Sequence, residues 1–352
     1  MYSPFYKIFA QQYFRIGWLI VCATLGMLGG CTSGKTDGCA DDLDLSNIQV
    51  KIEIEDLNPQ LMTLDTEAKA KEFIKKNPGF AQKFANLQRV GEQNVVKALV
   101  AFAKEPYMDS LYTQVKSVFG NYGKLKQELV AAFKHIKYYY PSFKIPQVKM
   151  AMTGIGSFFG RDIYMDDEVI FISPDYFSGL NAKFKPKEPY YIQRRYAPAY
   201  IVPVIVQAIS RTYNKIDVND HTLVADMVTR GKELQFVKTM MPCTHDSLIT
   251  GFTARQLANV NDKDNRKIIW GHFVEKQVLF AKSVRKKRAY MGERPYTAEV
   301  GVGKECPGKI GWWVGWQIVQ KYTRKFPKKT FQEVMAFDQN IHLFNASAYK
   351  GE

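Results

Sequence analysis

The sequence predicts an α+β fold that is mostly helical and carries a small β-sheet. Apolar residues recur three and four positions apart through most of the chain, which is the spacing of one helix face. Strand patterns are few, and they are confined to a stretch before residue 56 and to residues 147–173. Strands and helices that are grouped in this way indicate the α+β class.

The first half of the chain reads as one strand followed by helices. The strand is predicted at 47–55, where NIQVKIEIE alternates between apolar and polar residues. Asp65 is the predicted N-cap of the first helix, and most of the helices end near a proline or glycine. The predicted helices are 66–76, 79–87, 94–103, 108–119 and 124–140.

The middle of the chain holds two more predicted strands, 147–152 and 168–173. Between them lies GIGSFFG, at residues 154–160. Its glycines resemble a phosphate-binding loop, but the Lys-Ser/Thr pair of a P-loop is missing. We therefore interpret it as a connection between strands.

The second half of the chain returns to helical patterns. The predicted helices are 203–213, 221–241 and 264–280, the last with Ile268, Ile269, His272 and Phe273 on its inner face. Residues 253–256 and 330–333 each match a capping box, which predicts the start of two further helices.

The segment 307–322, PGKIGWWVGWQIVQKY, is the predicted central helix. Pro307 suits a first helical turn. Gly311 and Gly315 fall on one face, and each is unfavourable in a helix by roughly 1 kcal/mol relative to alanine. We expect them to let another backbone come very close. Polar residues interrupt the segment, so it is not a membrane span.

The N-terminus has the features of a lipoprotein signal peptide over residues 1–30. Lys7 and Arg15 supply positive charge, and residues 16–27 are apolar. Leu28-Gly29-Gly30-Cys31 resembles a lipobox, so Cys31 is the predicted lipid-attachment site. Lipidated Cys31 would hold the mature chain to a membrane.

Residues 31–46 are small, polar and acidic, which is typical of a flexible tether. Residues 47–352 are long enough for one large globular domain. Thr32 follows the lipidated cysteine where inner-membrane retention favours aspartate, so we expect the outer membrane. The sequence leaves the face of that membrane open.

The formal charge of the chain is +15, and loss of Lys7 and Arg15 with the signal leaves +13. Such a surplus predicts anionic neighbours, namely lipid headgroups, envelope polymers or acidic proteins. Nucleic acid does not fit an exported lipoprotein. Residues 282–288 carry five basic residues, which we interpret as a solvated charge run.

Three cysteines, Cys39, Cys243 and Cys306, remain after the signal peptide and Cys31 are set aside. The sequence leaves a disulfide between Cys243 and Cys306 open, but it favours two cysteines that are not bonded to each other.

The sequence lacks the common catalytic motifs. No two of its five histidines have the H-x-x-x-H spacing of a zinc-peptidase helix, and there is no G-x-S-x-G. His272 lies on an apolar helix face and is read as a core residue with a hydrogen-bond partner. We predict no metal, no cofactor and no catalytic residues.

The chain resembles the gliding motility-associated lipoprotein GldB family of the Bacteroidetes. The resemblance is distributed in order along nearly the whole mature chain. It is carried by Cys31 and by residues 50–53, 172–179, 191–196, 200–203, 228–232, 241–242, 251–253, 256–257, 270, 295–297, 307–311, 315–319 and 347–350.

This resemblance implies an envelope lipoprotein of gliding or type IX secretion machinery, with no established catalytic residues. The family is also distantly similar to zincin-type zinc peptidases, which implies a degenerate zincin-like scaffold. Its active helix would fall at 201–213, where Val206 to Ser210 offer no ligands. Arg230 stands where the next helix would supply the third ligand.

Three functional hypotheses follow from the sequence. The leading one is a non-catalytic outer-membrane lipoprotein that binds envelope proteins or anionic envelope polymers, and a purely structural scaffold is another. The rival from a different class is an envelope hydrolase that acts on peptides or cell wall through an unrecognised site. Arg194, Arg195 and Arg230 are candidate contacts for an anionic ligand, because guanidinium binds carboxylate or phosphate in a two-pronged manner. Structural ion pairs are the favoured alternative for these arginines.

Overall fold

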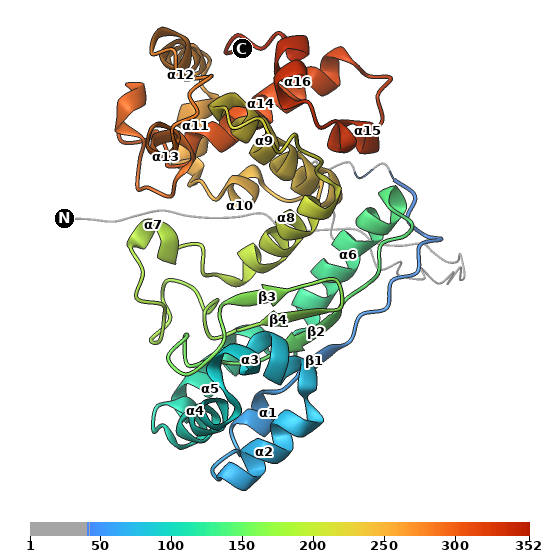
Figure 1. Ribbon diagram of the computed structural model, residues 1–352, viewed down its shortest axis with the longest axis vertical. Helices are drawn as coiled ribbons and strands as arrows, with labels where there is room; N and C mark the ends of the chain where they lie inside the picture. The colour runs from blue at the N-terminus through green and yellow to red at the C-terminus, as the bar shows by residue number, and fades with distance from the viewer. Residues whose placement is uncertain (1–40, 42) are drawn as a thin grey trace, which may run out of the picture. The chain divides into compact units, whose positions relative to one another are not determined.

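The computed structural model describes residues 41 and 43–352, and these residues form one compact unit (Figure 1). The predicted signal peptide 1–30, the lipid-attachment residue Cys31 and most of the predicted tether lie outside the described residues. The unit is mostly helical with one small sheet, so the predicted α+β class is confirmed.

The sheet has four strands in the order β1-β2-β4-β3. They are β1 (Ile54–Asp56), β2 (Gln147–Met150), β3 (Ile163–Met165) and β4 (Val169–Ile172). The pairs β1–β2 and β2–β4 are parallel, and β3 runs antiparallel to β4 at the edge. The predictions of β2 and β4 are confirmed, whereas β3 had no prediction.

The first strand is shorter than the predicted 47–55. Its register joins Ile54 to Val148 and Asp56 to Met150, so only one residue of β2, Gln147, lies opposite the chain before Ile54. The alternation still sets the faces, since Ile52 is buried while Lys51 is exposed. The pattern thus identified the inward side chains correctly but overestimated the hydrogen-bonded length.

The helices before residue 120 pack on one face of the sheet, around Phe171. They are α1 (Asn58–Leu61), α2 (Glu67–Lys76), the π-helix η1 (Phe80–Phe84), α3 (Leu87–Val90), α4 (Glu92–Lys104) and α5 (Met108–Phe119). The bounds of α5 are those predicted. Thr66, not Asp65, caps α2 by accepting from the backbone N–H of Lys69, while Asp65 forms an ion pair with the Lys69 ammonium group.

The loop after β2 is held by the buried carboxylate of Asp175. Its Oδ2 accepts hydrogen bonds from the backbone N–H groups of Thr153, at 3.0 Å, and Ile155, at 2.7 Å. Gly154, Ile155 and Gly156 all have positive φ, a conformation that is strained for isoleucine. The glycine-rich segment is therefore a connection, as interpreted from its sequence, and Asp175 fixes its shape.

We expect Asp175→Ala to lower the free energy of unfolding by about 2–4 kcal/mol, because two buried N–H groups lose their acceptor. Thermal unfolding should show the loss, and limited proteolysis should cut within 153–160. Asp167→Ala, at an exposed position nearby, is the control and should leave both unchanged. Equal behaviour of the two variants would contradict the role of Asp175.

The other face of the sheet is covered by α6 (Gly123–Tyr139) and α8 (Ile201–Tyr213) (Figure 1). Before α8 the chain forms the short helices α7 (Tyr190–Gln193) and η2 (Pro198–Tyr200). Helix α9 (Leu223–Met240) packs against α8, and its apolar residues belong to two clusters. Leu234 to Met240 join the cluster over the sheet, and Leu223 to Val228 join a second, C-terminal cluster.

The remaining helices of the chain contribute to the second cluster, except that Ile249, in the first of them, belongs to the cluster over the sheet. They are α10 (Asp246–Thr250), α11 (Ala254–Asn261), α12 (Lys263–Glu275), α13 (Val284–Met291), η3 (Ala298–Val300), α14 (Ile310–Lys325), α15 (Phe331–Ala336) and α16 (Asn340–Ser347). Both predicted capping boxes are confirmed, at the starts of α11 and α15. No helix of the described part is long and apolar enough to cross a bilayer.

Helix α12 differs from its prediction in length and in one inner-face residue. It ends at Glu275 rather than near Phe280, because Gln277 adopts positive φ and the chain then turns back to pair with the start of α9. Ile268 is exposed, whereas Ile269 and Phe273 are buried as expected. His272 is half-buried, and its Nε2 lies 2.9 Å from the Tyr290 hydroxyl, so it has the predicted hydrogen-bond partner.

Helix α14 is the buried central helix that the glycine pattern predicts. A Cβ atom at Gly315 would overlap the carbonyl oxygen of Met227, and one at Gly231 would overlap the backbone of Gly315. The backbones of α9 and α14 therefore touch directly. The helix begins at Ile310, because Lys309 adopts a left-handed conformation, so the placement of Pro307 in the first turn is wrong.

The open question of a Cys243–Cys306 bridge is answered by the structure. Cys243 is disulfide-bonded, whereas Cys306 is a buried free thiol, so these two do not pair with each other. Burial raises the pKa of the Cys306 thiol to about 12.

Candidate functional site

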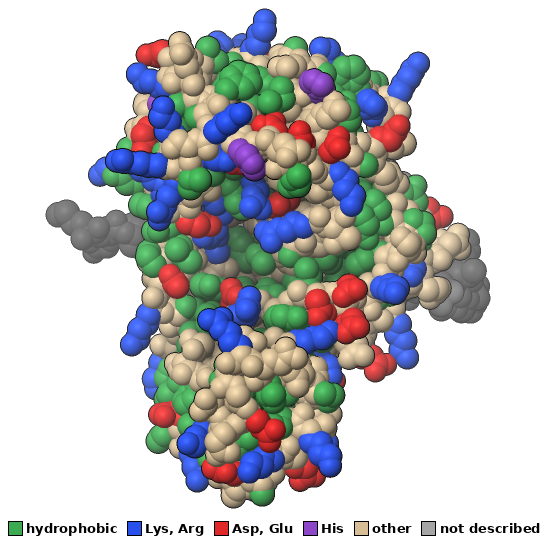
Figure 2. Space-filling view, viewed as in Figure 1, with side chains coloured by type: hydrophobic (Ala, Val, Ile, Leu, Met, Phe, Trp, Pro, Cys, Tyr) green, Lys and Arg blue, Asp and Glu red, His purple; other side chains and the backbone are tan. Residues whose placement is uncertain are grey.

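A cavity of about 210 Å³ lies between the α7–α8 region and the start of α14. In Figure 2 the middle of the visible face is hollowed, with apolar side chains inside and lysine and arginine side chains around it. The residues that line the cavity are Asp162, Phe177, Ile192, Arg195, Tyr196, Tyr200, Pro203, Val204, Gln207, Leu248, Ile249, Thr250, Gly251, Lys309 and Trp312.

One wall of the cavity is an ion-pair cluster around Glu293. The Arg195 guanidinium binds both oxygens of this carboxylate, at 2.9 and 2.8 Å, and Lys309 Nζ lies 2.7 Å from Oε1. Burial raises the pKa of Glu293, but the charges of Lys309 and Arg195 outweigh burial and hold it below its usual range. Glu293 is therefore a carboxylate that is shared by two cations.

A third cation, Arg194, lies behind this wall, in a small pocket that Arg195 and Lys309 also line, and it donates to the carbonyl oxygen of Gly251. Among the described residues no carboxylate lies within ion-pair distance of Arg194, and burial lowers the pKa of its guanidinium. Burial and the nearby charge of Arg195 lower the pKa of Lys309 to about 8, whereas the negative charge of Glu293 acts to raise it. Two cations thus share one carboxylate, with a third cation beside them; we call Arg194, Arg195 and Lys309 the cationic triad.

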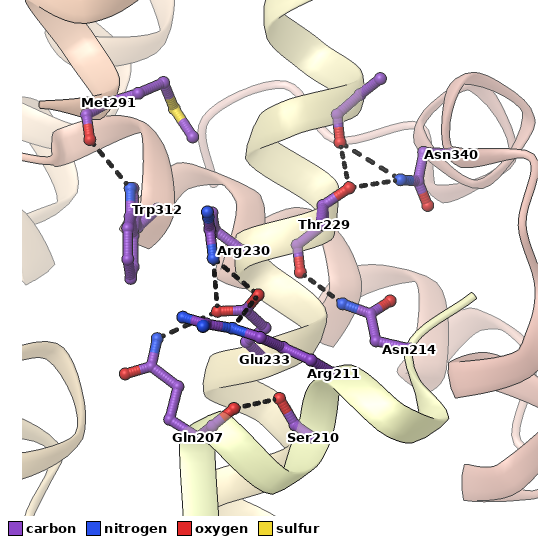
Figure 3. Close-up of polar contacts among 11 residues, drawn as sticks. Gln207, Ser210, Arg211, Asn214, Thr229, Arg230, Glu233, Met291, Trp312 and Asn340 are labelled. Atoms are coloured by element: carbon purple, nitrogen blue, oxygen red, sulfur yellow. Dashed lines mark hydrogen bonds and ion pairs between the residues drawn. The ribbon is translucent and has the colours of Figure 1, made fainter. Parts of the chain in front are cut away.

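Trp312 forms another part of the cavity lining. Lys309 Nζ lies 4.6 Å from the centre of its ring and the Arg230 guanidinium carbon lies 4.8 Å from it. The indole N–H donates to the Met291 carbonyl oxygen at 3.1 Å, which fixes the ring (Figure 3). Trp312 also lines a second cavity of about 440 Å³, where Arg230 faces several aspartates.

Beyond Trp312, the crossing of α8 and α9 is filled by a polar cluster around buried Glu233 (Figure 3). Arg230 donates to both of its oxygens, at 2.7 and 2.9 Å, and Gln207 donates at 3.1 Å. Arg211 Nε lies 3.5 Å from Oε1. These two helices are those that the zincin comparison assigns to metal ligands, and here the space holds ion pairs.

The structure brings together two of the three arginines proposed from sequence. Arg194 and Arg195 lie side by side in the cationic triad, whereas Arg230 is in an ion pair with Glu233. Sequence reasoning missed Lys309 and Glu293, and no local pattern marks either of them. The Arg230–Glu233 pair could have been predicted from its spacing of three on one helix.

Other charged groups of the described part serve local roles. In the basic run 282–288, Arg285 is exposed, as a solvated charge run predicts, whereas Lys287 departs from the prediction: its side chain is 15% exposed and pairs with Asp226 at 2.6 Å. Among residues 41 and 43–352, no group of three or more histidine, cysteine, aspartate or glutamate side chains could hold a metal ion.

Fold and site together define a mostly helical α+β protein with a cation-lined cavity beside its central helices. A family model described as gliding motility protein GldB matches residues 38–351, so the chain belongs to this family. Membership indicates a role in gliding motility and an association with the cell envelope. No curated protein and no solved structure matches the chain.

Several segments that carry the family resemblance meet at the cavity. They contribute Phe177, Arg195, Tyr200, Gly251 and Lys309 to its lining. At Gly251 the positive φ of 73° suits glycine, and a Cβ atom there would lie 3.0 Å from Arg195 Cδ. The shape of the cationic wall therefore depends on this glycine.

Proposed function

We propose that this protein is an outer-membrane lipoprotein that acts without catalysis in gliding or type IX secretion-related machinery. It binds an envelope protein or an anionic envelope polymer through the cavity beside Trp312. The observation that carries the proposal is the cationic triad, because Arg195 and Lys309 share a single carboxylate and Arg194 beside them has none among the described residues, which favours an anionic partner.

The ion pairs at the α8–α9 crossing support the non-catalytic part of the proposal. Gln207, Arg211 and Arg230 direct hydrogen-bond donors at Glu233, and donors of this kind repel a cation rather than ligate it. The Glu233 oxygens are satisfied by these partners. Stoichiometric zinc in the purified chain would contradict this part and favour an envelope hydrolase.

Site-specific photo-crosslinking in cells tests the binding proposal. A photoreactive amino acid at Val204, which lines the cavity and is 44% exposed, should capture a discrete envelope component. The control is the same probe at Val284, which is 78% exposed on α13, away from the cavity lining. Val204 is expected to give a product that Val284 does not give.

The lipid anchor is tested in the same cells. Cys31→Ala should move the protein out of the membrane fraction and remove the Val204 product, whereas Thr32→Ala should change neither. Membrane retention of Cys31→Ala would contradict the lipoprotein proposal. The same products from Val204 and Val284, or none from Val204, would contradict binding at the cavity.

A further inference from the structure

We infer that the cavity binds a carboxylate group of a partner polypeptide, with the adjoining apolar side chain seated against its apolar wall. The inference rests on the proposed function, because it names the ligand class of the same site. It depends on the charge, the unused donors, the size and the lining of the cavity.

The first argument is the charge of the buried wall. Arg195 and Lys309 share one carboxylate, Glu293, and Arg194 beside them has none within the described part of the chain. With Asp162, which also lines the cavity, three cations stand against two carboxylates, so one positive charge is in excess. The side chain of Lys309 is only 11% exposed and that of Arg195 only 22%. Buried charge is costly without a partner, and a bound carboxylate would supply one.

One donor beside the cavity lacks a hydrogen-bond partner in the part of the chain that the structure describes. The Nε atom of Arg195 is buried and has no acceptor among the described residues. Its two terminal nitrogens already hold Glu293, so the guanidinium is fixed in orientation. Fixed, charged donors bind carboxylates more strongly than mobile surface lysines do.

The size and lining of the cavity restrict what can accompany the carboxylate. Its volume of about 210 Å³ is below the roughly 300–1,000 Å³ of pockets for drug-sized ligands. It therefore suits one side chain rather than a nucleotide or an acyl chain. The apolar part of the lining is Phe177, Ile192, Pro203, Val204, Leu248 and Ile249.

The remaining groups favour a polypeptide over an acidic polysaccharide. A sugar ring stacks on an open aromatic face, but Lys309 and Arg230 both lie over the Trp312 ring. Gln207 and Asp162 offer an amide and a carboxylate at the lining, which can pair with the C=O and N–H of a peptide backbone. A chain terminus and an Asp or Glu side chain present the same chemistry, and the experiment distinguishes them.

Fluorescence anisotropy with labelled peptides on the purified full-length protein tests the inference. The first probe, Gly-Ser-Gly-Ser-Gly-Leu, has a free C-terminal carboxylate, and the second is its C-terminal amide. The third is the amide of Gly-Ser-Glu-Leu-Gly-Ser, in which the acid is internal. We expect saturable binding of the first or the third probe, which assigns the carboxylate to a terminus or a side chain, and no saturable binding of the second.

Variants connect the binding to the cavity. Arg195→Gln should weaken binding about 10- to 100-fold, which corresponds to loss of a hydrogen bond to a charged group. Val204→Glu, at a partly exposed lining position, should also abolish binding, and it leaves the ion pairs intact. Arg285→Gln removes the same charge from exposed α13 and should change affinity less than about twofold.

Several results would overturn the inference. One is no saturable binding of either acidic peptide, and another is equal binding of the neutral amide. Equal losses in Arg195→Gln and Arg285→Gln would show attraction to the net charge only. Displacement of the peptides by polygalacturonate at lower concentration would assign the site to a polysaccharide. Crosslinking from Val204 in cells that persists in Arg195→Gln would refute this ligand class and leave the proposed function standing.

Discussion

Gly315→Ala is expected to lower the free energy of unfolding by about 3 kcal/mol or more, at the upper end of overpacking effects. The added methyl group would overlap the Met227 carbonyl oxygen, which is backbone and cannot rotate away. Helices α9 and α14 would have to separate along a contact that both apolar clusters share. A typical domain has only about 5–15 kcal/mol of stability, so the loss is a large fraction.

Chemical denaturation measures this effect, and Gly271 in α12 supplies a matched control. Gly271 also lies inside a helix, but a Cβ atom there would have nothing within 4 Å. Gly271→Ala should therefore be neutral or should stabilise the protein by up to about 1 kcal/mol. A midpoint for Gly315→Ala equal to that of the wild type would show that the two backbones do not touch.

Lys232→Met is expected to have the second-largest effect, a loss of about 2–4 kcal/mol. Lys232 is fully buried in α9, and its ammonium group donates to the carbonyl oxygens of Lys215 and Phe337, each at 2.8 Å. It thus ties the segment after α8 and the segment between α15 and α16 to α9. Methionine fills the same space but leaves buried carbonyls without a donor. Lys215→Met, at an exposed side chain, should cost little.

The pH dependence of the same variant gives an independent check. Burial lowers the pKa of Lys232 to about 7, against roughly 10.4 for a lysine in an unfolded chain. Between these values the unfolded state binds more protons than the folded state, so stability rises with pH. The free energy of unfolding of the wild type should rise by up to a few kcal/mol from pH 7 to pH 10, and that of Lys232→Met should rise less. The difference in free energy of unfolding between the wild type and Lys232→Met should therefore increase with pH. A difference that stays constant over this range would contradict the lowered pKa of Lys232.

Local sequence signals predicted the helices well. Capping boxes fixed the starts of α11 and α15, and glycine after Phe119 marked the end of α5. The spacing of Gly311 and Gly315 even predicted a close helix crossing. Such features depend on residues within a turn or two of each other, which the sequence shows directly.

Features that depend on distant partners were missed or misjudged. The length of β1 is set by β2, which lies more than 90 residues later, and β3 has only three paired residues. At the candidate site, the neighbouring pair Arg194–Arg195 was visible in the sequence. Glu293 and Lys309 join it only through tertiary packing, and no spacing rule relates residues so far apart.

The buried Cys306 has a consequence for the disulfide chemistry of the folded chain. A thiol with a pKa of about 12 is almost wholly protonated at pH 7, with roughly one molecule in 10⁵ as thiolate. Because only the thiolate attacks a disulfide, Cys306 in the folded protein undergoes thiol–disulfide exchange very slowly. The folded protein can therefore hold a bonded Cys243 and a reduced Cys306 without exchange between the two.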